Sequence, residues 1–194
     1  MTNKKNSNKR IESTKRYIDQ LSKKYSKLTI VRVDLGYKKP YSDKTTLEEA
    51  NKDFNHMSNN MRSKPSIFKD KIGYVCKREY TKEKGVHYHA LFIFDGQKVQ
   101  KDVHKAKQIG EYWEQVTKEK GSYHNCNQNK YKRRGIGMLH HGDSDKRKIL
   151  DEDVIEYLCK DEQDINPIKT NKRDRAFTRC IIAKGNSNMG RPRK

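Results

Sequence analysis

Long apolar stretches are missing from this 194-residue sequence, in which 31% of residues are hydrophobic and 36% are charged. A membrane-spanning helix needs about 20 consecutive, mostly apolar residues. Neither such a run nor the apolar region of a signal peptide is present. We therefore expect a cytoplasmic protein with one modest core and no membrane partner.

Cysteine is also sparse, and its spacing excludes two further classes of protein. The four cysteines are far apart and form no Cys-x-x-Cys pair, so they predict reduced thiols rather than a disulfide framework or a zinc ribbon. A phosphate-binding P-loop is absent as well, which argues against a fused helicase. The cysteines are Cys76, Cys126, Cys159 and Cys180.

Positive charge is what the chain has in excess, with 45 Lys and Arg against 25 Asp and Glu and a net charge of +20. Such a surplus favours a polyanionic partner, of which nucleic acid is the best candidate. Residues 1–9 predict a disordered basic tail, 10–180 a single domain, and 181–194 a basic C-terminal tail. The end of that tail, Met189–Lys194, resembles the core of a minor-groove AT-hook, but a plain basic tail is the better interpretation because no arginine precedes Gly190.

Hydrophobic periodicity predicts an α+β fold with a central antiparallel sheet and helices against one face. The pattern alternates between helical spacing and strand alternation along the whole domain. The predicted helices are 11–25, 47–61, 103–116 and 151–160. The predicted strands are 28–35, 72–80 and 86–94, with weaker candidates at 122–127 and 136–141.

Two histidines on one predicted strand are the candidates for a metal site. Side chains alternate faces along a strand, so His87 and His89 point the same way. The segment Thr81–Gly85 is polar and ends in glycine, which suits a short hairpin loop. A hairpin centred on Glu83 would place Glu79 opposite His87, giving two imidazoles and one carboxylate around one point. A slip of one residue would move Glu79 to the other face, so the site depends on this loop.

Tyr157 is the candidate nucleophile. It lies three residues before Lys160 on a predicted helix, so the two would share a face. A free tyrosine has a pKa near 10 and reacts poorly at neutral pH, but a neighbouring ammonium favours the phenolate. Beside a divalent cation, the hydroxyl could attack a phosphodiester and form a covalent phosphotyrosine. The alternative is an ordinary half-buried helix tyrosine.

These residues resemble the motifs of the HUH endonucleases, the nickases of rolling-circle replication, conjugation and some transposition. The segment His87-Tyr88-His89 is similar to their histidine–hydrophobic–histidine motif. The segment Tyr157-Leu158-Cys159-Lys160 is similar to the Tyr-x-x-Lys form of replication initiators, and histidines before tyrosine is the order of replication proteins. Together with Val31–Leu35, the segments Gly85–Ala90 and Glu156–Lys160 resemble the YagK/YfjJ C-terminal domain family of filamentous-phage (inovirus) replication proteins.

The resemblance implies a ferredoxin-like, RRM-like sheet with the histidines on its central strand and the tyrosine on a nearby helix. It implies Mg²⁺ or Mn²⁺ as cofactor, held by Glu79, His87 and His89. The implied activity is nicking of single-stranded or hairpin origin DNA in a bacterial cell, giving a 5′-phosphotyrosine and a free 3′-OH, with later rejoining of strands. Because Asp153 and Asp161 stand one turn to either side of the tyrosine, a single-tyrosine enzyme is implied.

Three alternatives stay open at this stage. A basic DNA- or RNA-binding protein with incidental histidines would explain the charge equally well. A non-haem Fe(II) oxygenase also uses two histidines and a carboxylate, although the charge and the tyrosine helix argue against it. The third is a member of the family that binds an origin and no longer cuts. The sequence does not indicate an oligomeric state.

Overall fold

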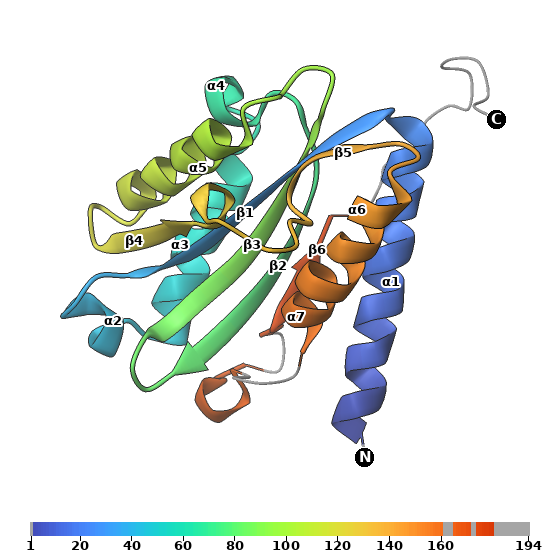
Figure 1. Ribbon diagram of the computed structural model, residues 1–194. Coiled ribbons are helices and arrows are strands. Elements are labelled where there is room, and N and C mark those ends of the chain that lie inside the picture. Colours follow the sequence, from blue (N-terminus) through green and yellow to red (C-terminus); the bar gives the residue numbers. More distant parts are fainter. Residues whose placement is uncertain (1, 161–164, 172–173, 181–194) are drawn as a thin grey trace.

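A six-stranded antiparallel sheet organises the protein, which is described here by a computed structural model (Figure 1). The described residues are 2–160, 165–171 and 174–180, with the backbone alone for 2–6. The strand order is β4-β1-β3-β2-β6, and β5 pairs with the first half of β1. The strands are β1 (Lys27–Tyr37), β2 (Lys71–Thr81), β3 (Gly85–Asp95), β4 (Gly121–Asn125), β5 (Gly137–His140) and β6 (Phe177–Arg179).

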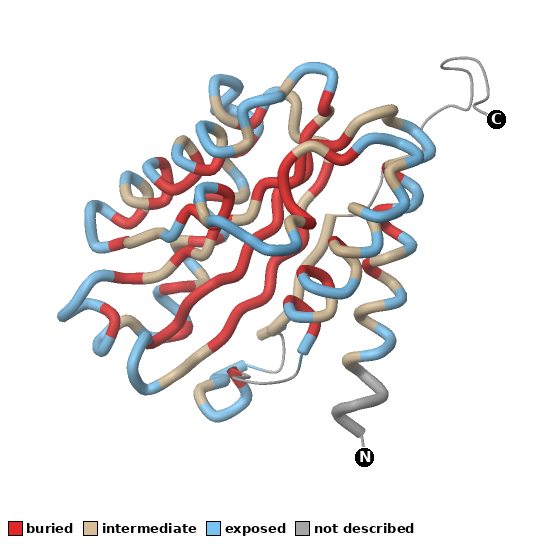
Figure 2. Tube along the Cα trace, in the orientation of Figure 1, coloured by how far each residue is buried: buried red, intermediate tan, exposed pale blue. Residues whose placement is uncertain are grey.

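Helices pack on both faces of the sheet, and not on one face as expected from the sequence. α3 and α5 cover one face, while α1 and the helical run Ser144–Cys159 cover part of the other. β3 is therefore buried on both sides, and the tube in Figure 2 is red along β3 and much of β1 and β2, and blue on the outer turns of the helices. The helices are α1 (Thr2–Lys24), α2 (Tyr41–Lys44), α3 (Leu47–Asn60), α4 (Pro65–Phe68), α5 (Asp102–Val116), α6 (Ser144–Ile149) and α7 (Glu156–Cys159), with a π-helical segment at Leu150–Ile155.

The order of elements confirms the predicted fold class. β1, α3 and β2 form one unit, and β3, α5 and β4 form the second. Their strands interleave as β4-β1-β3-β2, which is the ferredoxin-like arrangement. The histidine-bearing strand β3 consequently lies in the middle of the sheet, between β1 and β2.

Local sequence signals account for the ends of α3. Thr46 caps its N-terminus: the side chain accepts from the Glu49 N–H, and the Glu49 carboxylate accepts from the Thr46 N–H. The helix stops at Asn60, before Pro65, which opens the short helix α4. Leu47, Ala50, Phe54 and Met57 form its buried stripe, as the helical spacing predicts.

The N-terminal segment differs from the prediction, because α1 begins at Thr2 where a disordered tail was expected. Polar contacts stabilise this extension. The hydroxyl of Ser7 donates to the backbone carbonyl of Cys159 at 2.9 Å, and Lys15 pairs with Glu156 at 3.1 Å. α1 thus packs against the helix that carries Tyr157 and stabilises it. Residues 181–194, including the AT-hook-like end, lie outside the described residues. Within the described residues, no helix combines the length and the apolar character of a membrane span.

The helix that carries Tyr157 starts earlier than the acidic run at Asp151 suggested. It begins at Ser144, where the Asp143 side chain accepts from the Lys146 N–H. It then passes through the π-helical segment, in which the Glu156 N–H donates to the Asp151 carbonyl five residues back. The last helical residue is Cys159, and Lys160 already has an extended ψ of 146°.

Candidate metal centre and tyrosine site

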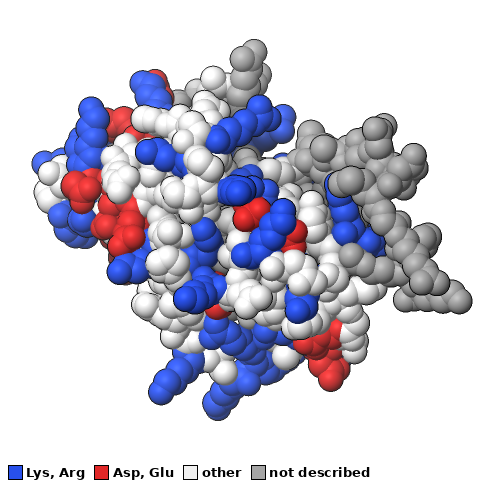
Figure 3. Space-filling model, turned by 90° about the horizontal axis from the view of Figure 1, so that it is seen from above, with Lys and Arg blue, Asp and Glu red and all other residues white. Residues whose placement is uncertain are grey.

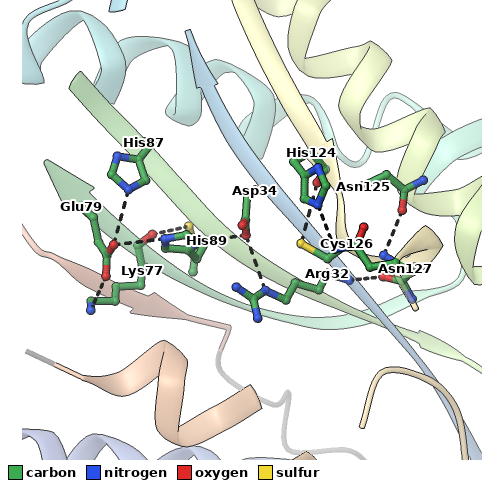
Figure 4. Close-up of polar contacts among 12 residues, drawn as sticks. Arg32, Asp34, Lys77, Glu79, His87, His89, His124, Asn125, Cys126 and Asn127 are labelled. Carbon is green, nitrogen blue, oxygen red and sulfur yellow. Dashed lines mark hydrogen bonds and ion pairs between the residues drawn. The ribbon is translucent and has the colours of Figure 1, made fainter. Parts of the chain in front are cut away.

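The hairpin of β2 and β3 brings Glu79, His87 and His89 together, as predicted. The register pairs Glu79 directly with His87, so the loop is centred where the sequence indicated. One potential ligand atom from each of the three side chains lies within 4.8 Å of the other two, and all three residues are buried (Figure 4). The group could hold a metal ion.

The outer ring nitrogens of the two histidines are already engaged, which fixes the nitrogens that face the cluster. His87 Nδ1 lies 3.0 Å from the backbone carbonyl of Gly85, and His89 Nδ1 lies 2.8 Å from Asp34 Oδ1. The two Nε2 atoms then point at the same carboxylate oxygen, Glu79 Oε2, at 3.4 Å and 3.1 Å. Metal-binding histidines usually have their other nitrogen fixed in this way by a carbonyl or carboxylate.

His87 Nε2 is the ligand atom of the cluster with the weakest polar contact. It is shielded from solvent, and its contact with Glu79 Oε2, at 3.4 Å, is too long for a good hydrogen bond. Buried polar atoms are nearly always well paired, so this position favours a further partner. A cation shared with His89 and Glu79 would supply one, and two imidazoles with one carboxylate leave coordination positions open for a substrate. The residues present therefore fit a divalent metal.

Opposite charges shift the pKa values within the cluster in opposite directions. Burial alone would raise the pKa of Glu79, but the polar contacts with His87, His89 and Lys77 hold it well below its usual range. Burial alone would lower the pKa of His89, but hydrogen bonds to Asp34 and Glu79 raise it to about 9. In the metal-free protein at neutral pH, the site is thus an ionised carboxylate beside a protonated imidazole.

β1 contributes a polar row that the motif analysis did not assign to the site. Asp34 stands directly opposite His89 on β3, and Arg32 Nε lies 3.5 Å from Asp34 Oδ1. Burial would raise the pKa of Asp34, but His89 and Arg32 lower it, so the carboxylate stays charged. The sequence held a signal for this row: Arg32 and Asp34 share a face with the apolar Ile30 on a strand that is otherwise buried.

Lys77 is a second residue that sequence reasoning missed. Its side chain is 3% exposed, and its ammonium pairs with Glu79 Oε1 and donates to the backbone carbonyl of Lys160. Lys77 occupies one carboxylate oxygen of Glu79 and leaves Oε2 facing the histidines. The same ammonium ties the C-terminal end of α7 to the metal cluster, as a basic side chain near a helix terminus commonly does.

Tyr157 lies beside the cluster, with its side chain at the surface. Its ring centroid is 5.8 Å from that of His89, and the residue is 45% exposed. The guanidinium carbon of Arg32 stands 4.8 Å from the centre of the tyrosine ring. Lys160 is exposed and directly follows the last helical residue; its φ of −58° is helical and its N–H donates to the Tyr157 carbonyl at 3.3 Å, so it lies one turn beyond Tyr157. The cation packed against the tyrosine is Arg32.

The cluster opens toward β4 through a hollow of about 440 Å³. His87, His89 and Asp34 form one wall, and His124 lies across from Asp34 on β4. In Figure 4, Asp34 stands between the cluster and His124. A ligand in this hollow would therefore meet His87 and His89 of the cluster.

Comparison with known proteins identifies a family. Residues 1–180 match the family model of the YagK/YfjJ C-terminal domain, which covers nearly the whole chain. Neither a curated protein nor a solved structure matches the sequence.

Proposed function

We propose, from the premise that this chain belongs to the YagK/YfjJ C-terminal domain family, that it is a metal-dependent nickase of the HUH type. Its proposed role is to initiate replication by cutting single-stranded or hairpin origin DNA and later rejoining the strands. The observation that carries the proposal is the juxtaposition of the Glu79–His87–His89 cluster with the exposed Tyr157, 5.8 Å from His89.

The proposed cofactor is Mn²⁺ or Mg²⁺, bound through Glu79 Oε2 and the Nε2 atoms of His87 and His89. When bound, such an ion polarises a phosphodiester oxygen and stabilises the charge that develops on phosphorus. Asp34 fixes the ring of His89, and Gly85 fixes the ring of His87, so both are preorganised for this role.

In the proposed reaction, Tyr157 attacks the scissile phosphorus. A bond forms between its Oη and phosphorus, the bond from phosphorus to the 3′ oxygen breaks, and a 5′-phosphotyrosine and a free 3′-OH result. The phenol proton passes to solvent, which reaches the half-exposed side chain, and the leaving oxygen takes up a proton. Arg32 is placed to stabilise the negative charge that develops during the attack, because its positive charge lies over the ring. One phosphoester replaces another, so the reverse reaction can rejoin the strand.

The net charge of +20 supports a nucleic-acid partner. Figure 3 shows Lys and Arg side chains spread over one face of the molecule with Asp and Glu among them. Such a distribution favours attraction to DNA over a broad surface rather than at one basic patch. The chemistry then depends on the geometry at the metal cluster.

The test is covalent adduct formation. The protein is incubated with Mn²⁺ and a single-stranded oligonucleotide library with a randomised centre, and adducts are isolated on a denaturing gel. We expect the adduct to map to Tyr157 and to disappear in Tyr157→Phe, while Mn²⁺ binding persists. Lys160→Ala should slow the reaction without abolishing it.

Tyr131→Phe is the matched control, because Tyr131 is the other exposed tyrosine near Arg32 and is 39% exposed. An adduct on Tyr131 or on any other tyrosine would overturn the assignment. DNA binding without any adduct would instead favour a non-catalytic binding protein.

A further inference from the structure

Two hollows run from the metal cluster around the edge of the sheet. The first, of about 440 Å³, has His87, His89 and Asp34 on one side. The second, of about 860 Å³, reaches the start of α5. Both are lined by Tyr123 and His124 of the edge strand β4, so they adjoin at this strand, and the two together are called the groove.

Small residues open the inner part of this groove. Gly36 of β1 pairs with Ser122 of β4, and both line the first hollow. A Cβ on Gly36 would lie 3.6 Å from the Ser122 hydroxyl and 3.7 Å from His87 Cβ, so even a methyl group would narrow the passage at this point. The passage beside the metal ligands is thus lined by a glycine and a short serine side chain.

The outer part of the groove is basic. Lys101, His104 and Lys107 line it from α5 and the residue before that helix. Its acidic residue, Asp102, is bound by Arg134 at 2.9 Å, which offsets its charge. Val103, 40% exposed, adds an apolar surface between the cations. A groove that combines cations with exposed apolar surface suits a single-stranded polynucleotide, whose phosphates and bases need both.

The position of the tyrosine gives this groove a direction. Tyr157 stands beside His89 at the level of Arg32, whereas the first hollow begins beyond Arg32 along β1, at Asp34, and extends to Tyr37 at the end of that strand. In phosphoryl transfer the attacking and leaving oxygens stand roughly in line on opposite sides of phosphorus. A nucleophile at the level of Arg32 therefore expels the leaving 3′ oxygen toward Asp34 and the hollow.

We propose that the groove from the metal cluster to Lys101 and Lys107 holds the upstream strand, the one that ends in the 3′-OH after cleavage. This inference rests on the proposed function and extends it. The downstream strand is held covalently on Tyr157, while the groove holds its former neighbour by phosphate and base contacts. Retention keeps the 3′-OH beside the phosphotyrosine, as rejoining requires.

The experiment uses the cleavage site mapped from the library adducts. A long oligonucleotide carries about ten nucleotides upstream of the scissile phosphate, which would fill a single-strand groove, and a short one carries two. After cleavage with Mn²⁺, retention of the labelled upstream fragment is measured under native conditions for the wild type and for Lys101→Gln/Lys107→Gln. If each lysine contacts one phosphate, the double variant should hold the long fragment about 25-fold less tightly at 0.1 M salt. Adduct formation from the short oligonucleotide should be unchanged.

The control is Lys52→Gln/Lys69→Gln, which removes the same charge from α3 and from the end of α4. Lys52 and Lys107 each form an i,i+4 ion pair, so the two double variants are matched in this respect as well. Retention in this control should equal that of the wild type. Equal retention in the groove variant and the wild type, or equal losses in both double variants, would overturn the proposal. Failure of the wild type to form any adduct would refute the proposed nickase itself, so the two failures are distinguishable.

Discussion

Metal binding should expel one proton from the cluster, and this prediction tests the site without any DNA. The pKa of His89 is about 9 in the metal-free protein, so at pH 7 about 99 in 100 molecules carry a proton on this ring. With Nδ1 turned to Asp34, a metal at Nε2 has to displace that proton. Affinity for Mn²⁺ should therefore rise about tenfold per pH unit well below pH 9, and about 50-fold between pH 7 and pH 9, where half of the rings have lost the proton. That rise corresponds to about 2.3 kcal/mol of binding free energy.

Isothermal titration calorimetry in buffers of different ionisation enthalpy counts the protons directly. We expect about one proton released per Mn²⁺ at pH 7 and a declining number as the pH passes 9. Asp34→Asn removes the largest interaction that raises the pKa of His89, so this variant should release fewer protons at pH 7. Proton-free Mn²⁺ binding at pH 7 would refute the assignment of His89 as a ligand.

The same pKa shift gives a stability trend with a defined sign. The pKa of His89 is raised from 6.5 to about 9 on folding, so the protonated ring stabilises the metal-free fold. Its full contribution is present below pH 6.5 and is lost as the pH rises through 9. Chemical denaturation in a chelating buffer measures this trend.

Three further predictions concern cleavage, binding and the hairpin loop. His87→Ala and His89→Ala should each abolish adduct formation and leave part of the DNA affinity, since basic side chains carry most of it; unchanged nicking by the double variant would contradict the metal site. DNA affinity should fall steeply between low and physiological salt, because each neutralised phosphate releases counterions, and a flat response in a salt titration would contradict the electrostatic argument. Gly85→Ala should destabilise the fold by about 2 kcal/mol or more and displace His87. Gly85 has a φ of +63°, and an added Cβ would lie 2.0 Å from the Ser42 carbonyl oxygen, so thermal unfolding should show the loss of stability.

The hairpin shows what local sequence could predict. The polar loop between β2 and β3 fixed the register, and the register alone placed Glu79 opposite His87. The strands and the longer helices followed from periodicity for the same reason, because each depends on residues close together in the chain. The antiparallel sheet and the central place of β3 followed from these elements and their order.

The missed parts of the site depend on contacts between distant segments. Arg32 reaches Tyr157 across 125 positions only because β1 lies beside β3 and the helix packs over both. Lys77 meets Lys160 for a similar reason, and α1 extends to Thr2 because polar groups on the tyrosine helix meet it. No periodic pattern within one segment encodes such pairings, so the sequence could not assign the cation beside the tyrosine.

The π-helical segment before Tyr157 changes the direction in which the side chains after it point around the helix axis. In an α-helix each residue advances the direction of the side chain by about 100°, and a π-turn takes up one surplus residue. The bond from the Glu156 N–H to the Asp151 carbonyl marks that surplus. Every residue after it, Tyr157 included, is rotated relative to the regular helix that starts at Ser144.

A one-residue deletion between 150 and 155 should therefore leave the direction of the tyrosine unchanged. The helix would become regular while Tyr157 still faced Arg32 and His89, because the deletion removes the residue that the π-turn takes up; a regular helix without the deletion would instead turn Tyr157 by about 100°. Distances along the chain between motifs are consequently a poor guide to geometry in this fold. A relative with the same motifs and one residue fewer in this helix could place its tyrosine in the same direction on a regular α-helix.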